Sequence, residues 1–90
     1  MLFSRIFGHK VFIDKDLVGY ISPDGDMFSD GYKFGVLTEY GEIYIHDEYV
    51  GYIDDNDNII CDDINNGYVS PSNDLVFASL ELIIKDKDND

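Results

Sequence analysis

The chain has few means of cross-linking or anchoring itself. Cys61 is the only cysteine among 90 residues, so no intramolecular disulfide can form and either a reducing compartment or no redox role is indicated. No segment approaches the roughly 20 consecutive apolar residues of a membrane-spanning helix. The N-terminal segment lacks the unbroken apolar stretch and the small-residue cleavage site of a signal peptide. These absences predict a cytoplasmic protein that does not contact membranes.

Basic residues are also scarce. Six Lys and Arg stand against nineteen Asp and Glu, a formal net charge of −13, and no Lys or Arg lies between Lys33 and Lys85. Nucleic-acid binding needs clustered cations, so direct contact with a phosphate backbone is not expected. A basic protein surface is the partner that this charge favours. The alternative is that the charge only keeps the protein soluble.

A sixteen-residue repeat is the strongest pattern in the sequence. Around four glycines the chain aligns without gaps as units 12–27, 28–43, 44–59 and 60–75. The glycines are Gly19, Gly35, Gly51 and Gly67. Six residues after each glycine stands a residue type that tolerates the positive φ of a tight turn. Self-similarity at a fixed period is the signature of a repeat architecture.

Each unit has room for two short strands and two turns. The strand segments are rich in Val, Ile, Phe and Tyr, which favour β-structure, and they are too short for stable helices. We therefore predict a single all-β domain of four tandem 16-residue β-hairpin repeats around a pseudo-fourfold axis, flower- or barrel-like, with little or no helix. Residues 1–11 would add a strand or hairpin, residues 76–84 a closing strand, and residues 85–90 an acidic tail.

Alternation along a strand assigns the two faces of each repeat. The glycine and the aliphatic residue two positions later share one face, which we expect to be the core, with neighbouring backbones approaching closely at the glycine. The opposite face is expected to carry Tyr20, Phe34, Tyr52 and Tyr68. A tyrosine buries its ring and keeps its hydroxyl in water, so packing between hairpins is favoured for this face. The alternative is a self-association surface that makes a homo-oligomer.

The segments VGYISPDG (18–25) and VGYIDDND (50–57) resemble known bacterial repeats. They are similar to the short β-hairpin repeats of four-fold β-flower proteins and to the Gly-Tyr-Ile-x-x-x-Gly core of WG repeats. The resemblance covers residues 12–77 and implies hairpin petals around an axis, without an assigned activity. The chain departs from WG repeats because it has no Trp and its units are shorter.

The residues that could support catalysis or metal binding are few. Cys61 stands at the repeat position of two isoleucines, which predicts a buried structural thiol, and His46 stands where the other units have Asp. The paired carboxylates lie in turns, where they stay solvated, so no catalytic residue and no cofactor are predicted. Asp54, Asn56 and Asn58 are spaced like the start of a calcium loop but lack its later Gly and Glu, leaving a weak surface site as an alternative.

Charge therefore carries the functional prediction. We expect a non-enzymatic acidic module that binds a basic protein, such as an inhibitor of a nucleic-acid-handling protein of the immunity or phage anti-defence type. The alternative is a self-associating scaffold. The acidic residues predicted to bind the partner are Asp47, Glu48, Asp54, Asp55, Asp57, Asp62 and Asp63.

Overall fold

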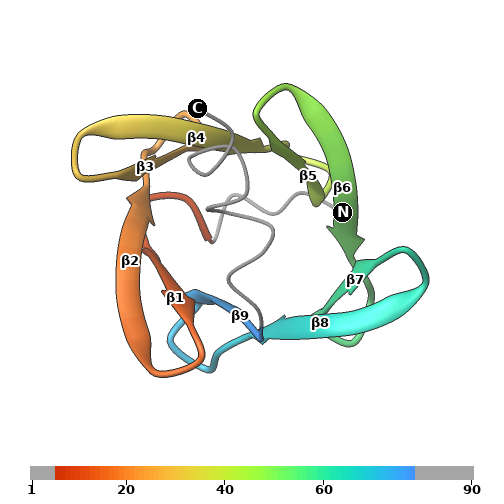
Figure 1. The fold of residues 1–90 in the computed structure, drawn as a ribbon. Coiled ribbons are helices and arrows are strands. Elements are labelled where there is room, and N and C mark those ends of the chain that lie inside the picture. The colour runs from red at the N-terminus through yellow and green to blue at the C-terminus, as the bar shows by residue number, and fades with distance from the viewer. Residues whose placement is uncertain (1–5, 79–90) are drawn as a thin grey trace.

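The computed structural model describes residues 6–78, which form a closed barrel of nine β-strands (Figure 1). The strands are β1 (Lys10–Ile13), β2 (Asp16–Ile21), β3 (Asp26–Ser29), β4 (Tyr32–Leu37), β5 (Glu42–Ile45), β6 (Glu48–Ile53), β7 (Asn58–Cys61), β8 (Ile64–Val69) and β9 (Leu75–Phe77). The predicted all-β class is confirmed. No helix among residues 6–78 is long and apolar enough to cross a membrane.

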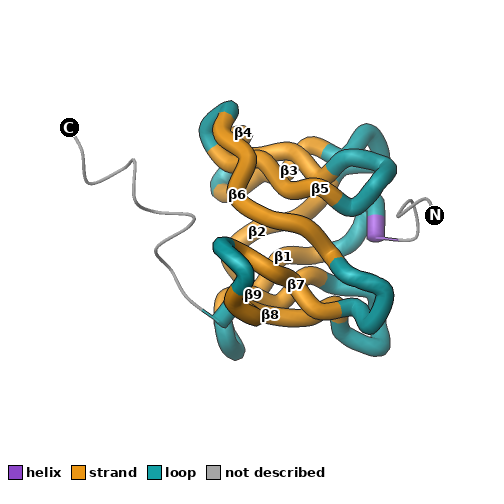
Figure 2. The backbone as a smooth tube through the Cα atoms, turned by 90° about the vertical axis from the view of Figure 1, so that its right-hand side faces the viewer, coloured by secondary structure: helices purple, strands orange, loops and turns teal. Residues whose placement is uncertain are grey.

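Consecutive strands pair as four antiparallel hairpins, which we call petals 1 to 4: β1–β2, β3–β4, β5–β6 and β7–β8. The turn inside each petal, its tip, has two residues, and longer loops connect one petal to the next. Tips and long loops therefore gather at opposite ends of the barrel (Figure 2). The four petals surround one central axis (Figure 1).

The ring closes through β9, which lies between β8 and β1. It pairs antiparallel with β8 and parallel with β1, where Val11 faces Leu75 and Ile13 faces Phe77. Facing residues in β1 and β9 hold the same repeat position, four periods apart. Closure thus places the first strand of a fifth unit beside the first strand of the first unit.

Each petal contains the same β-bulge directly before its glycine. In petal 2, Met27 faces Gly35 while Phe28 faces Lys33, so Phe34 is the extra residue. Val18, Val50 and Asn66 are the extra residues of the other petals. Such a bulge interrupts the alternation of side chains and increases the local twist of the strand.

The glycines allow adjacent petals to approach closely, as the sequence predicted. A Cβ on Gly35 would lie 2.5 Å from the carbonyl oxygen of Tyr44 in the next petal. Cβ atoms on the other three glycines would meet the equivalent carbonyl oxygens of Phe28, Ile60 and Val76 at even shorter range. Because real side chains cannot make such contacts, the close seam between petals requires glycine at this position.

Aliphatic side chains fill the barrel interior. The residues two and eight positions after each of the four repeat glycines are buried. Fully buried examples are Ile21, Met27, Ile43, Ile59 and Leu75. A closed sheet with an apolar interior has no free strand edge.

Phe34 corrects the predicted division of faces. It is only 3% exposed and belongs to the core, not to the outer tyrosine face. The reason is the bulge: the extra residue shifts alternation by one position, so Phe34 and Gly35 are both buried. Val18 and Val50, its equivalents, also pack against the core.

The predicted outer segments are tested only in part. Ile6 is fully buried, and β1 forms one arm of petal 1 instead of belonging to a separate N-terminal hairpin. The barrel closes with residues 75–77, whereas the closing strand was predicted at 76–84. Residues 1–5, 79–84 and the predicted tail 85–90 lie outside the described residues.

Candidate protein-binding surface

The tips hold one group of the predicted acidic residues. They consist of Asp14-Lys15, Asp30-Gly31, His46-Asp47 and Asp62-Asp63, and the first residue of each has a positive φ between 53° and 56°. Two-residue hairpin turns require this conformation, which Asp, Asn and Gly adopt more readily than other residues. Asp47, Glu48, Asp62 and Asp63 therefore lie at the tip end of petals 3 and 4.

The long loops hold the other group. The third loop, residues 54–57, is fastened by the Asp54 carboxylate, whose Oδ1 accepts the backbone N–H groups of Asn56 and Asn58, both at 2.9 Å. Backbone hydrogen bonds from Asn58 and Asn56 lower the pKa of Asp54, against the opposing effect of desolvation. In the other loops a hydroxyl of Ser22, Thr38 or Ser70 accepts the equivalent bond.

The predicted acidic run is therefore divided between two ends of the barrel. Asp54, Asp55 and Asp57 lie at the long-loop end, whereas the other four predicted residues lie at the tip end (Figure 2). The six-residue strand β6 between them spans roughly 20 Å at about 3.3 Å per residue. The seven residues therefore do not form one continuous acidic rim and occupy both ends of petals 3 and 4.

The charge of that side is not balanced from within. Residues 38–69, which we call the acidic half, contain nine Asp and Glu and no Lys or Arg. Residues 6–37 contain five Asp and three Lys. Lys33 Nζ lies 3.3 Å from Asp26 Oδ1, and His9 Nδ1 lies 3.5 Å from Asp74 Oδ1. Among the described residues, Glu39, Glu42 and Asp55 make no such ion pair.

Tyrosines cover the wall between the two acidic ends. Five of the seven tyrosines belong to the acidic half, and Tyr49 and Tyr52 are 54% and 41% exposed. The rings of Tyr44 and Tyr49 pack edge to face, with centroids 5.6 Å apart. Desolvation, and secondarily the negative charge of Glu42, raise the pKa of Tyr49, so it remains neutral.

Three of the four residues predicted for the outer face lie there. Tyr20, Tyr52 and Tyr68 are about half exposed, and Tyr20 stacks on Phe28 of the next petal at 5.3 Å between ring centroids. That stacking is a contact between petals, and the exposed remainder is available to a partner. Phe34, the fourth, is buried as described above.

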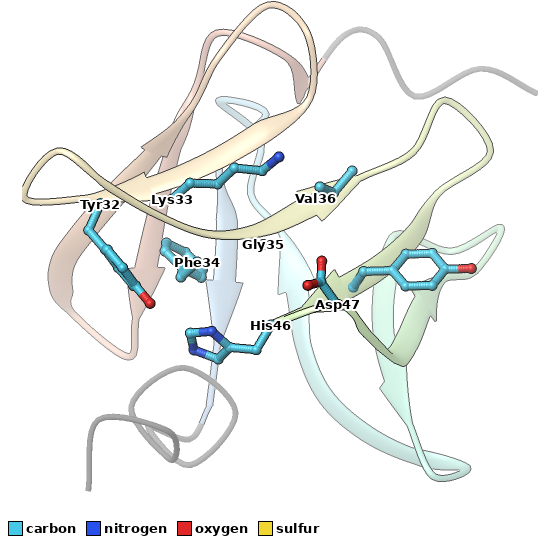
Figure 3. A pocket seen from close by; sticks show the side chains of 8 residues that line it. Tyr32, Lys33, Phe34, Gly35, Val36, His46 and Asp47 are labelled. Carbon is cyan, nitrogen blue, oxygen red and sulfur yellow. The ribbon is translucent and has the colours of Figure 1, made fainter. Parts of the chain in front are cut away.

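A cleft that sequence reasoning missed lies between petals 2 and 3 (Figure 3). Its volume is about 270 Å³, and its lining comes from residues 32–36 of β4 together with Tyr44, His46 and Asp47. Similar clefts lie at the seams between petals 1 and 2 and between petals 4 and 1. Each of the three is lined by one of the repeat glycines, at which neighbouring petals approach closely.

The remaining sequence candidates are a thiol, an imidazole and a loop carboxylate. Cys61 is buried, as predicted, and burial raises the pKa of its thiol. His46, the first residue of its tip, is half-buried in the cleft wall. At the calcium candidate, Asn56 and Asn58 direct N–H donors at the Asp54 carboxylate, which disfavours a cation at that oxygen. No three His, Cys, Asp or Glu residues gather as a metal site within residues 6–78.

No protein-family model, curated protein or solved structure matches the chain. The resemblance to β-flower and WG repeats therefore stays a prediction. What the structure adds is a surface with a defined charge and shape.

Proposed function

We propose that the protein is a non-enzymatic binding module whose acidic half receives a basic surface of a protein partner. The observation that supports this most directly is the charge asymmetry, because nine carboxylates and no Lys or Arg lie in residues 38–69. Such a field speeds the approach of cationic partners and rejects acidic ones.

The tyrosine wall favours arginine in the partner. Guanidinium groups stack on aromatic rings and form paired hydrogen bonds with carboxylates, and the acidic half offers both kinds of group side by side. Tyrosine and arginine are also the residues most enriched in the energetic centres of protein interfaces.

The spacing of the carboxylates fits a partner that handles nucleic acid. Two acidic ends separated by a wall of roughly 20 Å could follow a cationic groove as phosphates do. A surface of this height is compatible with the roughly 800 Å² that each partner contributes to a standard interface. Inhibition of a nucleic-acid-binding protein by occupation of its groove is the form of the proposal that we favour.

Two triple variants, one in each half of the barrel, test the proposal when their binding is compared. The first, Glu39→Gln/Asp55→Asn/Asp63→Asn, removes three charges from the acidic half; the second, Asp16→Asn/Asp24→Asn/Asp30→Asn, removes three from the other half. Binding of a short arginine-rich peptide would be measured by calorimetry between low and high salt. We expect the first variant to weaken binding about tenfold at low salt and the second about twofold or less. Equal losses, or binding that ignores salt, would contradict the proposal.

Self-association is a second candidate, supported by exposed apolar side chains near the tips. Leu17 and Ile64 are 58% and 67% exposed, and Tyr20 and Tyr68 add partly exposed rings to the outer wall. Sedimentation over a range of protein concentrations distinguishes this candidate. A scaffold forms an oligomer that Tyr20→Ser/Tyr68→Ser disrupts and that the acidic-half variant leaves intact.

A further inference from the structure

The cleft between petals 2 and 3 has a floor made by the bulge and its glycine. Phe34 closes its base from the core side, and Gly35 lies close against the backbone of Tyr44 in petal 3 (Figure 3). Its volume of about 270 Å³ lies just below the roughly 300–1,000 Å³ of most small-molecule sites. That space suits one long side chain better than a cofactor.

Aromatic groups form the sides of this cleft. The rings of Tyr32 and His46 lie 6.3 Å apart between centroids and are inclined by 43°. Tyr44 contributes to the lining, and its ring is held in place by the edge-to-face contact with Tyr49. Flat faces in this arrangement are suited to a flat ligand group.

The only acid in the lining is Asp47. It is exposed and makes no ion pair with a described residue. Lys33 also belongs to the lining, but its ammonium lies 3.3 Å from Asp26 of its own petal, and its side chain points away from His46 (Figure 3). The charge that the cleft offers to an incoming group is therefore negative.

The two related clefts lack this combination. One contains Lys10 and Asp30 with a single tyrosine, Tyr20, and the other contains Lys15 and Asp14 with Tyr68. Neither lysine forms an ion pair with a described residue, so in each of these clefts an available ammonium offsets the charge of the aspartate. Among the three clefts, only the one at the border of the acidic half combines two tyrosines and a histidine with a carboxylate and has its lysine held in an ion pair.

We propose that the cleft between petals 2 and 3 receives one arginine side chain of the partner, an inference that rests on the proposed function. The guanidinium fits the groups that the cleft presents: it stacks on the ring of Tyr32 and donates two hydrogen bonds to Asp47. A lysine ammonium is compact and strongly hydrated, so it gains less from flat aromatic walls. The cleft therefore selects arginine over lysine within a basic partner.

The test compares two tip residues at the same repeat position. Asp47 and Asp63 both follow the first tip residue and both have a positive φ, 67° and 63°. Asp47→Asn and Asp63→Asn thus remove the same charge from the same kind of turn, and Asn tolerates that φ. Two short peptides that differ only in having Arg or Lys serve as probes, with affinities measured at one low salt concentration.

We expect Asp47→Asn to weaken the arginine peptide about tenfold and the lysine peptide about threefold. Asp63→Asn should weaken both peptides alike, by about threefold or less, because it changes only the general field. Tyr32→Leu should reduce the preference for arginine without changing the charge. In an NMR titration of the wild-type protein, the arginine peptide should shift the amide signals of Gly35 and Asp47.

The outcomes separate this inference from the proposed function. Equal effects of Asp47→Asn and Asp63→Asn on the arginine peptide overturn the cleft, while salt-dependent binding to the acidic half stands. An unchanged preference for arginine in Tyr32→Leu also overturns it. If neither peptide binds at low salt, the proposed function fails first and the inference fails with it.

Discussion

The two halves of the barrel have the same backbone and different surfaces. Residues 6–37 and residues 38–69 each supply two petals with the same strand register, the same bulge and the same glycine. Their charges differ widely, since the first half carries five Asp and three Lys and the second nine acidic residues with no Lys or Arg. Most tyrosines also belong to the second half.

The difference distinguishes residues that determine the fold from surface residues that do not. Positions that recur in both halves are those where the backbone leaves no choice: the glycine at the seam, the aliphatic side chains of the core and the positive-φ residues of the turns. Charge and aromatic character vary between halves because the outer surface tolerates them. A function built on this scaffold is therefore most readily sought where the halves differ.

The largest predicted effect concerns what the halves share. Gly19→Val and Gly51→Val should each destabilise the protein by about 3 kcal/mol or more, or prevent folding, because overpacking against a rigid backbone has no cheap relief. At Gly51 the new side chain would meet the carbonyl oxygen of Ile60 and lie 2.8 Å from Cys61 Sγ. Urea unfolding followed by circular dichroism measures the loss.

Gly31→Asn is the matched control for that prediction. Gly31 has φ +78° and no atom within 4 Å of the position of a Cβ. Asn tolerates this conformation, so the change should stay within about 1 kcal/mol. If Gly51→Val unfolds at the same urea concentration as the wild type, the close approach of the petals is refuted. If only one half responds, the halves do not share a scaffold.

The second prediction concerns the bulge residue, which is larger in petal 2 than in petal 3. Phe34→Ala should cost about 3–5 kcal/mol, because the side chain is almost fully buried and its removal leaves a cavity. Val50→Ala, at the same position in petal 3, should cost about 1–2 kcal/mol, since fewer methyl groups are lost from a partly buried site. Equal unfolding free energies for the two variants would contradict the assignment of Phe34 to the core.

Phe34 also shows where prediction from the sequence ends. The sixteen-residue period identified the hairpins, and the residues after each glycine were placed correctly because no irregularity follows the glycine. The residue before it was misplaced, since a bulge leaves no signal in a period-2 pattern. The repeated residue types at 18, 34 and 50, all apolar, were the one available indication.

The candidate surface was predictable in composition but not in shape. The acidic residues were found from charge alone. Their separation was not, because β6 runs from the tip end of the barrel to the long-loop end and β7 runs back again. The tip at Asp30-Gly31, a typical two-residue hairpin turn, could have located Asp47 and Asp63 by the repeat. The cleft could not be found, because it forms between Gly35 and a neighbouring petal whose proximity only the folded barrel establishes.

The smallest predicted effect concerns the third long loop, residues 54–57. It is the only one of the four long loops in which a carboxylate accepts the backbone hydrogen bonds. Asp54 accepts backbone bonds that hydroxyl groups accept in the other three long loops. Its pKa is lower in the folded protein than its ordinary value of 3.8. A lowered folded-state pKa contributes stability that is present above the unfolded value and is lost as the pH falls through the folded value.

Asp54→Ser should therefore remove a pH dependence while keeping the loop. Serine supplies the hydroxyl used in the first and fourth loops and does not titrate in this range. The difference in unfolding free energy between wild type and variant should shift against the wild type as the pH falls from 7 to below about 3.8.

Asp55→Ser is the control, because it removes the same charge from the same loop without removing the backbone bonds. Its difference in unfolding free energy from the wild type should lack that shift. If the two variants show the same pH profile in urea unfolding, general charge repulsion explains the whole effect and the Asp54 carboxylate does not stabilise its loop.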